Sequence, residues 1–214
     1  MYHVIVKRQF SWIGLLARNV LLAFAVASIL AGCGAPTAST DLPDGVRHVD
    51  PPVQLNDFAL TNQQNQTVHL RDLEGKATLI TFGYTHCPDI CPINLANFKL
   101  IKKALGENAA QVNFVFFSVD SKRDTPDVLA KHLQLFDPTF IGITGDDAAI
   151  LPVTQQFGAF YQIATPEPGK TDYLVVHTAS SYLVDKGGKV IRNYEYQTQP
   201  DVIAADILQT LKAS

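Results

Sequence analysis

Methionine is almost absent from this chain of 214 residues, since Met1 is the only one. A metal site built from several thioether side chains is therefore excluded. Basic residues are also few: 17 lysines and arginines stand against 20 aspartates and glutamates, which gives a formal net charge of −3. A chain with this balance lacks the basic surface that nucleic-acid binding requires, so no nucleic-acid partner is expected.

The apolar stretch near the N-terminus is too short to cross a lipid bilayer. It runs from Val20 to Ala31, twelve residues of which only Ser28 is polar, whereas a membrane-spanning helix needs about 20 apolar residues. Basic residues before a short apolar stretch are typical of an export signal. The tetrapeptide Leu30-Ala31-Gly32-Cys33 resembles the bacterial lipobox, which implies cleavage before Cys33 and acylation of that cysteine. The alternative is an uncleaved helix from about Phe10 to Ala31, which also leaves the protein exported and tethered.

These signals divide the chain into three parts. Residues 1–32 are predicted to be a lipoprotein signal peptide. Residues 33–52 are rich in small and polar side chains and end in Pro51-Pro52, which predicts a flexible tether. Residues 53–214 remain for one domain, and the 47% of hydrophobic residues in the chain is enough for a packed core. We expect a lipid-anchored protein of the bacterial cell envelope, with the domain facing the periplasm or another extracytoplasmic space.

Strand and helix patterns alternate along this domain. The run from Val112 to Val119 is almost continuously apolar and rich in β-branched and aromatic residues, which is typical of a strand covered on both faces. The predicted strands are 58–60, 68–70, 77–83, 112–119, 140–143, 173–176, 180–184 and 190–194, and the predicted helices are 92–105, 125–136, 146–157 and 200–211. This order predicts the α/β class and a thioredoxin-like fold, with residues 58–70 as an N-terminal β-hairpin extension.

Two cysteines remain once Cys33 is assigned to the lipid. Cys87 and Cys91 lie between a predicted strand and a predicted helix, where the helix N-terminus stabilises a thiolate. Residues four apart share one face of a helical turn, so both sulfurs can point at one spot and either form a disulfide or bind a soft metal ion. The spacing is one residue longer than the C-x-x-C of efficient disulfide exchangers, which favours a bridging ion. An inert disulfide that closes this short loop is the other alternative.

His177 is the candidate third ligand. If residues 180–185 form the strand that follows the cis-proline of thioredoxin-like folds, Ala179 occupies the proline position. His177 then lies two residues before it, beside the cysteine loop. Two thiolates and one imidazole suit copper(I), and zinc also accepts these donors.

Several segments together resemble one known family. The segment Tyr84-Thr85-His86-Cys87-Pro88-Asp89-Ile90-Cys91-Pro92 is very similar to the signature of the Sco/SenC family. These are copper-handling, thioredoxin-fold proteins that serve assembly of the copper A centre in cytochrome c oxidase. The resemblance continues in order through Phe117-Ser118-Val119-Asp120 with Arg123-Asp124-Thr125-Pro126, Phe140-Ile141-Gly142 with Thr144-Gly145, Asp172-Tyr173-Leu174-Val175 before His177, and Tyr182-Leu183-Val184-Asp185.

The resemblance implies a ligand set and a partner. Cys87, Cys91 and His177 match the family's copper ligands, so a copper ion is the expected cofactor. The implied partners are cytochrome c oxidase subunit II or its assembly factors, with the membrane contacted through the lipid anchor. The chain departs from the family at Val176, where an acidic residue is usual, and this leaves partner docking and copper affinity open.

Two functions follow from these residues. The first is a membrane-anchored copper chaperone that delivers copper to cytochrome c oxidase. The second is a thiol-disulfide oxidoreductase acting on exported cysteine or copper proteins, in which Cys87 attacks and Cys91 resolves. His86 adjoins Cys87 but is expected to point away from the metal, and Asp120 and Arg123 either form an ion pair near the site or lie in a solvated loop.

Overall fold

A computed structural model of the chain describes residues 42–165 and 172–213. The predicted signal peptide, Cys33 and the first part of the predicted tether lie outside these ranges. Within the described residues, no helix combines the length and the apolar character needed to cross a bilayer.

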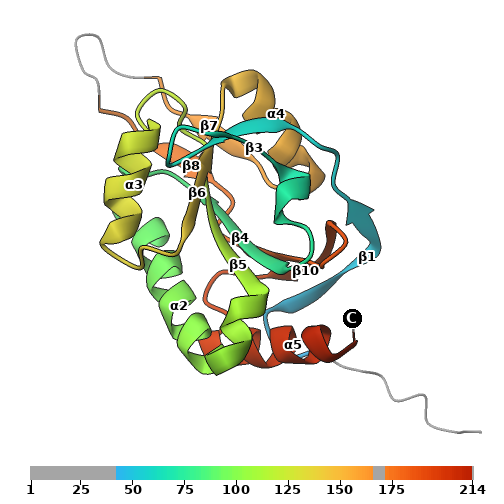
Figure 1. Cartoon of the computed structure of the whole chain (residues 1–214). Coiled ribbons are helices and arrows are strands. Elements are labelled where there is room, and N and C mark those ends of the chain that lie inside the picture. The colour runs from blue at the N-terminus through green and yellow to red at the C-terminus, as the bar shows by residue number, and fades with distance from the viewer. Residues whose placement is uncertain (1–41, 166–171, 214) are drawn as a thin grey trace, which may run out of the picture. The chain divides into compact units, whose positions relative to one another are not determined.

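The core of the domain is an eight-stranded mixed sheet (Figure 1) with the order β1-β10-β9-β4-β5-β6-β2-β3. Its strands are β1 (Val46–Gln54), β2 (Ala59–Asn62), β3 (Thr67–His69), β4 (Ala77–Gly83), β5 (Val112–Ser118), β6 (Ile141–Thr144), β9 (Ser181–Val184) and β10 (Lys189–Tyr194). The central strands β4, β5 and β6 are parallel, and β9 pairs with β4 in the antiparallel sense. Every residue of β4 is buried, because helices cover both faces of the sheet at this position.

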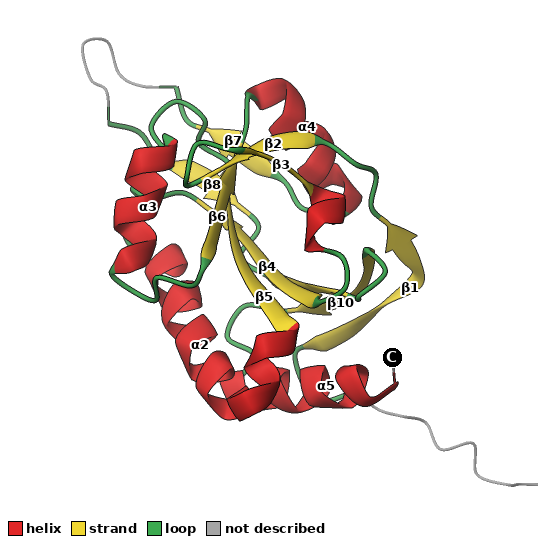
Figure 2. Cartoon of the chain, viewed as in Figure 1, coloured by secondary structure: helices red, strands yellow, loops and turns green. Residues whose placement is uncertain are grey.

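Among the described residues, four α-helices cover the sheet (Figure 2), namely α2 (Ile90–Leu105), α3 (Pro126–Gln134), α4 (Asp147–Gln156) and α5 (Pro200–Ala213). The helices α2, α3 and α5 lie on one face, and α4 lies on the other with the short 3-10 helix η2 (Leu70–Leu73). A second 3-10 helix, η3 (Gly106–Gln111), leads from α2 into β5. The predicted start of α3 is confirmed, since the Thr125 hydroxyl accepts a hydrogen bond from the Val128 amide and Pro126 is the first helical residue.

A separate two-stranded sheet carries the candidate histidine. It pairs β7 (Tyr161–Ile163) with β8 (Val175–His177), and His177 lies opposite Tyr161. The sequence patterns did not predict β7. This strand has only three residues, which is too short for an alternating pattern to be recognised.

The predicted β-hairpin extension is confirmed, because β2 and β3 pair with each other and β2 adds to the edge of the sheet beside β6. The predicted end of the tether is wrong. Residues 46–54 form β1, which pairs with β10 from Val46 opposite Tyr194 to Gln54 opposite Lys189. Pro51-Pro52 suggested a linker, but an edge strand tolerates proline, and the pairing is interrupted between His48 and Val53 where the prolines lie.

Candidate metal centre

The two cysteines lie where the central strand β4 passes into α2. Cys87 belongs to the connecting loop, and its amide donates a hydrogen bond to the Tyr84 carbonyl at 3.2 Å. Cys91 belongs to the first turn of α2 and is only 1% exposed, whereas Cys87 is half-buried. The helix begins at Ile90 rather than at the predicted Pro92, so Cys91 is fixed by helical backbone and Cys87 by the loop.

Gly83 leaves the space that the Cys91 sulfur occupies. A Cβ atom at this position would lie 2.6 Å from Cys91 Sγ and 2.8 Å from the Phe116 ring. Gly83 ends β4, and its carbonyl accepts a hydrogen bond from Val119 at 2.9 Å, so the backbone has little freedom to move away. Only glycine at position 83 leaves room for the Cys91 thiol in this position.

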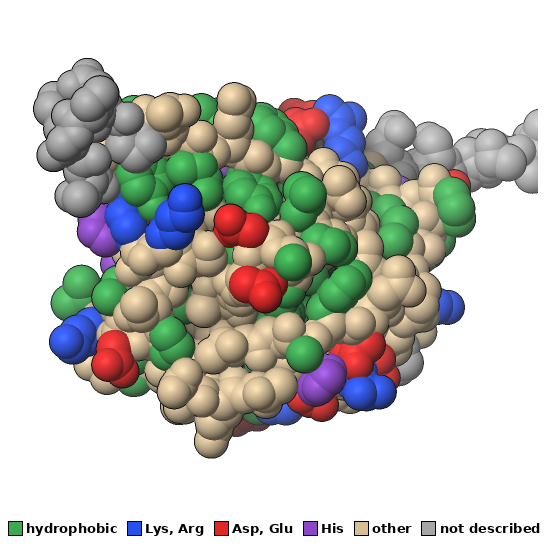
Figure 3. All heavy atoms as spheres, turned by 90° about the horizontal axis from the view of Figure 1, so that it is seen from above, with side chains coloured by type: hydrophobic (Ala, Val, Ile, Leu, Met, Phe, Trp, Pro, Cys, Tyr) green, Lys and Arg blue, Asp and Glu red, His purple; other side chains and the backbone are tan. Residues whose placement is uncertain are grey.

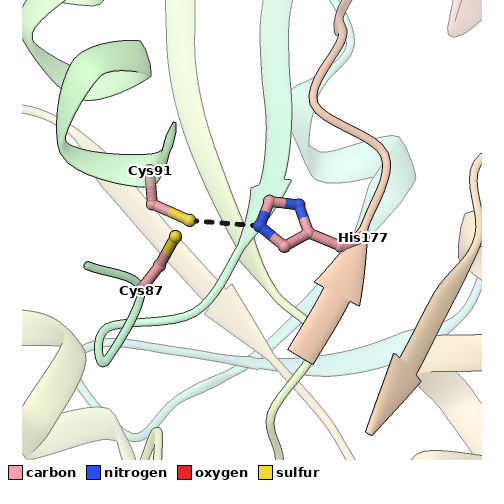
Figure 4. A group of neighbouring side chains, drawn as sticks. All are labelled: Cys87, Cys91 and His177. Carbon is pink, nitrogen blue, oxygen red and sulfur yellow. Dashed lines mark hydrogen bonds between the residues drawn. The ribbon is translucent and has the colours of Figure 1, made fainter. Parts of the chain in front are cut away.

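His177 ends β8 and turns its ring toward the cysteines (Figure 4). Its Nδ1 lies 3.1 Å from the Thr178 carbonyl oxygen. Because a carbonyl only accepts hydrogen bonds, Nδ1 carries the hydrogen of the neutral ring and Nε2 has a free lone pair. Nε2 lies 3.4 Å from Cys91 Sγ, so the tautomer that can bind a metal faces the sulfurs.

The ligand atoms of Cys87, Cys91 and His177 all lie within 4.8 Å of one another. Among residues 42–165 and 172–213, no other group of three histidine, cysteine, aspartate or glutamate side chains converges in this way. The structure therefore brings together the three residues that the sequence singled out, from a loop, a helix and a distant strand. The donor set of two sulfurs and one imidazole nitrogen fits a soft metal ion such as copper(I).

The two thiols share one proton unequally. The pKa of Cys87 is lowered to about 4, chiefly by its hydrogen bond with the Cys91 side chain and further by the backbone amides of Asp89 and Cys91, while burial opposes the shift. The pKa of Cys91 is raised, first by the same hydrogen bond and then by burial. At neutral pH Cys87 is therefore the thiolate and Cys91 the thiol, and binding a metal ion to both requires the Cys91 proton to leave.

This asymmetry predicts an unusual pH profile for alkylation. Cys87 is expected to react with iodoacetamide at a rate that changes little through the neutral range and falls only as the pH approaches about 4. Replacing Cys91 with alanine removes the hydrogen bond that stabilises the thiolate, so the inflection should move upward toward the value of about 8.5 that is usual for a free cysteine. A wild-type rate that rises steeply above neutral pH, as for an ordinary thiol, would show that the pair does not share its proton in this way.

Asp124 is a site residue that sequence reasoning missed. Its carboxylate is fully buried and accepts hydrogen bonds from the Thr85 hydroxyl at 2.6 Å, the Thr85 amide at 2.9 Å and the Ser118 hydroxyl at 2.6 Å. Burial raises the pKa of Asp124, although these donors oppose the shift. Asp124 thereby links Thr85, which lies two residues before Cys87, to Ser118 at the end of β5.

Asn94 was also missed, although it lies only three residues after Cys91. This buried side chain donates hydrogen bonds to the Ala179 carbonyl and to the Thr81 hydroxyl, both at 3.1 Å. It therefore joins α2 to the segment that follows His177. A polar residue at a helix position facing the core was the available signal, but its partners lie too far along the chain to be found from the sequence.

His86 does not join the group formed by Cys87, Cys91 and His177, as expected. Its Nδ1 lies 3.1 Å from the Thr85 hydroxyl, and half of its side chain is exposed. Asp120 and Arg123 form an ion pair and do not lie in a solvated loop, since Arg123 Nε and Asp120 Oδ2 are 2.6 Å apart.

Comparison with known proteins identifies the family of this chain. The model of the SCO1/SenC family matches residues 48–212. The chain belongs to this family. A SCO2-like protein of Rickettsia felis is 33% identical over 204 residues, which cover 92% of this chain and 98% of the relative. The predicted family is therefore confirmed, and the match runs from β1 to the last turn of α5.

Solved structures of the SCO1/SenC family confirm the predicted thioredoxin-like fold. Bradyrhizobium japonicum ScoI with copper bound is 37% identical, with a TM-score of 0.67, and the match covers 74% of this chain and 99% of that one. BsSco, described as a member of the Sco family of cytochrome c oxidase assembly proteins with a disulfide switch, is 26% identical with a TM-score of 0.61, covering 77% of this chain and 96% of that one. Copper in the first structure agrees with the predicted cofactor.

Val176 lies beside the metal-binding group, but its side chain takes the opposite side of β8 from His177. It is 57% exposed, and Phe160 and Leu174 of the same hairpin are similarly exposed. Figure 3 shows a face of the domain on which hydrophobic side chains lie in scattered groups, with acidic and basic side chains between them. Position 176 therefore presents an exposed apolar side chain and is not one of the three residues that converge at the site.

Replacing Gly83 with alanine is expected to disturb the site and the fold together. The new methyl group would overlap Cys91 Sγ and the Phe116 ring, and overpacking of this kind costs about 2 kcal/mol of folding free energy. Urea denaturation measures the loss. Gly187→Ala is the matched control, since a Cβ at Gly187 meets nothing closer than an Asp185 oxygen at 3.5 Å. Equal stability of the two variants would argue against the tight packing around Cys91.

Proposed function

We propose that this protein is a membrane-anchored copper chaperone that delivers copper for assembly of the copper A centre of cytochrome c oxidase. The observation that carries the proposal is the convergence of Cys87, Cys91 and His177 within 4.8 Å. Membership of the SCO1/SenC family and the copper bound to the related ScoI support it.

The donor set favours copper(I) over zinc as the cargo. Structural zinc sites are almost always tetrahedral with four protein ligands. Among the described residues no fourth histidine, cysteine or acidic side chain joins the group, whereas copper(I) accepts two soft thiolates and one imidazole. His86, the nearest alternative ligand in sequence, is held to Thr85 instead.

The unequal exposure of the ligands suggests how copper is released. Cys91 is buried on the core side, and His177 is fixed through Thr178, whereas Cys87 is half-buried and lies in a loop. A thiolate of the acceptor protein therefore reaches the ion from the Cys87 side, and transfer proceeds by exchange of one sulfur ligand for another. The proposed acceptor is cytochrome c oxidase subunit II or one of its assembly factors.

Anchoring is proposed from the sequence alone. Leu30-Ala31-Gly32-Cys33 has the residues of a lipobox, so Cys33 is the proposed acylated first residue of the mature protein. This places the domain on the extracytoplasmic side of a bacterial membrane. Intact-mass measurement on membrane-extracted protein tests the proposal, which is wrong if the chain begins at Met1 and carries an unmodified Cys33.

A second function, thiol-disulfide exchange, is favoured by the lowered pKa of Cys87. The Cys87 thiolate would attack a partner disulfide and release one partner thiolate. Cys91 would then lose its proton and attack Cys87 Sγ, which releases the second partner thiolate and leaves a Cys87–Cys91 disulfide. Each turnover consumes the two electrons of the dithiol, so an external thiol reductant must restore it.

One experiment separates the two functions. The copper(I)-loaded protein is mixed anaerobically with the metal-free, reduced copper A domain of subunit II, and in parallel the metal-free reduced protein is mixed with the oxidised domain. The chaperone proposal predicts that copper moves to the reduced domain. If copper stays on this protein while the oxidised domain is efficiently reduced, thiol-disulfide exchange is the function and the chaperone proposal fails.

A further inference from the structure

A buried ion pair lies just outside the metal-binding group and holds the strand that carries His177. Asp120 is fully buried and follows β5. Its Oδ2 accepts a hydrogen bond from Arg123 Nε at 2.6 Å, and its Oδ1 accepts one from the Tyr173 hydroxyl at 2.7 Å. Tyr173 precedes β8, four residues before His177, so this carboxylate joins the start of the histidine strand to the central sheet.

The arginine connects this carboxylate to a second tyrosine. The Arg123 guanidinium lies 3.5 Å from the centroid of the Tyr173 ring and 5.5 Å from that of the buried Tyr84 ring. Both distances are within the range of cation-π attraction. Arg123 therefore contacts one aromatic ring from the segment that leads into β8 and one from the cysteine loop.

Tyr84 in turn contacts the parts of the site itself. Its ring packs edge-on against the His177 imidazole, with centroids 5.8 Å apart and an interplanar angle of 87°. The Val175 backbone, two residues before the histidine, lies near the Tyr84 hydroxyl and opposes the rise in the pKa of Tyr84 that burial causes. The Tyr84 carbonyl accepts the hydrogen bond from the Cys87 amide. One residue thus contacts the imidazole, its strand and the cysteine loop.

The histidine strand needs such support because it does not belong to the main sheet. β7 and β8 form a pair of three-residue strands, and an isolated two-stranded hairpin is marginally stable in water. Its position relative to the cysteines must therefore be set by contacts with the rest of the domain. On the side before His177, the contacts described above provide this link.

We propose that four positioning residues, here called the tyrosine-arginine cluster, fix the His177 imidazole beside the two sulfurs: Tyr84, Asp120, Arg123 and Tyr173. The inference rests on the proposed function, since it concerns how the third ligand of the same copper site is held. The cluster does not touch the metal. It acts by reducing the freedom of a ligand whose strand is otherwise weakly attached, which strengthens binding through preorganisation.

The fold supplies a matched control at a distance from the site. Tyr194 donates a hydrogen bond to Asp206 Oδ2 at 2.7 Å, and Arg192 Nε lies 3.2 Å from the same oxygen. This is again a tyrosine, a buried aspartate and an arginine, but it joins β10 to α5. Tyr173→Phe and Tyr194→Phe each remove one hydroxyl that is bonded to a buried carboxylate, and only the first belongs to the tyrosine-arginine cluster.

The test compares these two variants with the wild type in two measurements. In the reduced, metal-free protein, NMR line widths of the His177 ring report whether the imidazole keeps one position. Anaerobic competition with a copper(I) chelator measures the copper(I) affinity of the protein, which shows how much the His177 imidazole contributes to binding. Tyr173→Phe should broaden the His177 resonances and lower the copper(I) affinity about tenfold, equivalent to ~1.4 kcal/mol. Tyr194→Phe should leave the resonances unchanged and the affinity within about twofold, although a hydrogen bond to a charged group is lost in both variants.

The outcomes separate failure of this inference from failure of the proposed function. If Tyr173→Phe behaves like Tyr194→Phe in both measurements, the cluster does not position the histidine and the inference is overturned. If Tyr173→Phe does not fold, Arg123→Lys takes its place, because it keeps the charge but loses the flat guanidinium that packs on the rings, and the same expectations and the same refutation apply. If the wild type binds no copper(I), the proposed function fails, and the metal-free NMR comparison still decides whether the cluster holds His177.

Discussion

Replacement of His177 by alanine is expected to lower the copper(I) affinity by about 100-fold or more, equivalent to ~2.7 kcal/mol. Loss of a group that only orients a metal ligand already lowers affinity by about 10- to 100-fold, and here the ligand itself is removed. Formation of the Cys87–Cys91 disulfide should survive, because the two sulfurs are placed by the loop and by α2 and not by the histidine. Anaerobic chelator competition and thiol titration after mild oxidation measure the two properties.

His86→Ala is the matched control for this variant. His86 is also a histidine and lies next to Cys87 in sequence, but its Nδ1 lies 3.1 Å from the Thr85 hydroxyl and it does not join the group of Cys87, Cys91 and His177. We expect its copper(I) affinity to remain within about twofold of the wild type, a change well under the ~1.4 kcal/mol of a tenfold effect. If His177→Ala kept full affinity, or if His86→Ala lost as much, the ligand assignment would be wrong.

Replacement of Asp124 by alanine is expected to destabilise the domain by about 3–5 kcal/mol, because three hydrogen-bond donors lose their common acceptor and each buried donor left unsatisfied costs about 1–3 kcal/mol. The donors are the Thr85 amide and hydroxyl and the Ser118 hydroxyl. The cysteine loop should lose its fixed position as well, so copper(I) affinity should fall under conditions where the variant is still folded. Urea denaturation followed by circular dichroism measures the stability.

Asp127→Ala provides the comparison for Asp124. Asp127 is exposed in the first turn of α3, where an acidic residue contributes only about 0.3–1 kcal/mol through the helix dipole. A loss for Asp124→Ala no larger than that of Asp127→Ala would mean that the buried carboxylate does not hold the loop.

The parts of the fold with strong local signals were predictable. The central strands β4 and β5 are long apolar runs, and α3 begins with a capping threonine and a proline, so their positions follow from burial and capping. The edge strand β1 was hidden because its prolines, which an edge position tolerates, are also typical of a linker. β7 was missed because three residues give no periodicity.

The three residues of the candidate metal centre were also predictable, but the residues that hold them in place were not. Cys87 and Cys91 stand out by spacing, and His177 by its place in a thioredoxin-like fold. Asp124 and Asn94 are ordinary polar residues in the sequence, and their importance comes from partners that are 39 and 85 residues away in the chain. Which buried donor meets which acceptor is decided by tertiary packing, and no local pattern reports it.

X-ray absorption spectroscopy at the copper edge, on the protein loaded with one equivalent of copper(I) under anaerobic conditions, tests the central claim most directly. Coordination by two sulfurs and one imidazole nitrogen is the predicted result, with the nitrogen contribution absent from the His177→Ala protein. A wild-type spectrum with two sulfurs and no imidazole would contradict the account, since His177 would then lie close to the thiols without binding the metal.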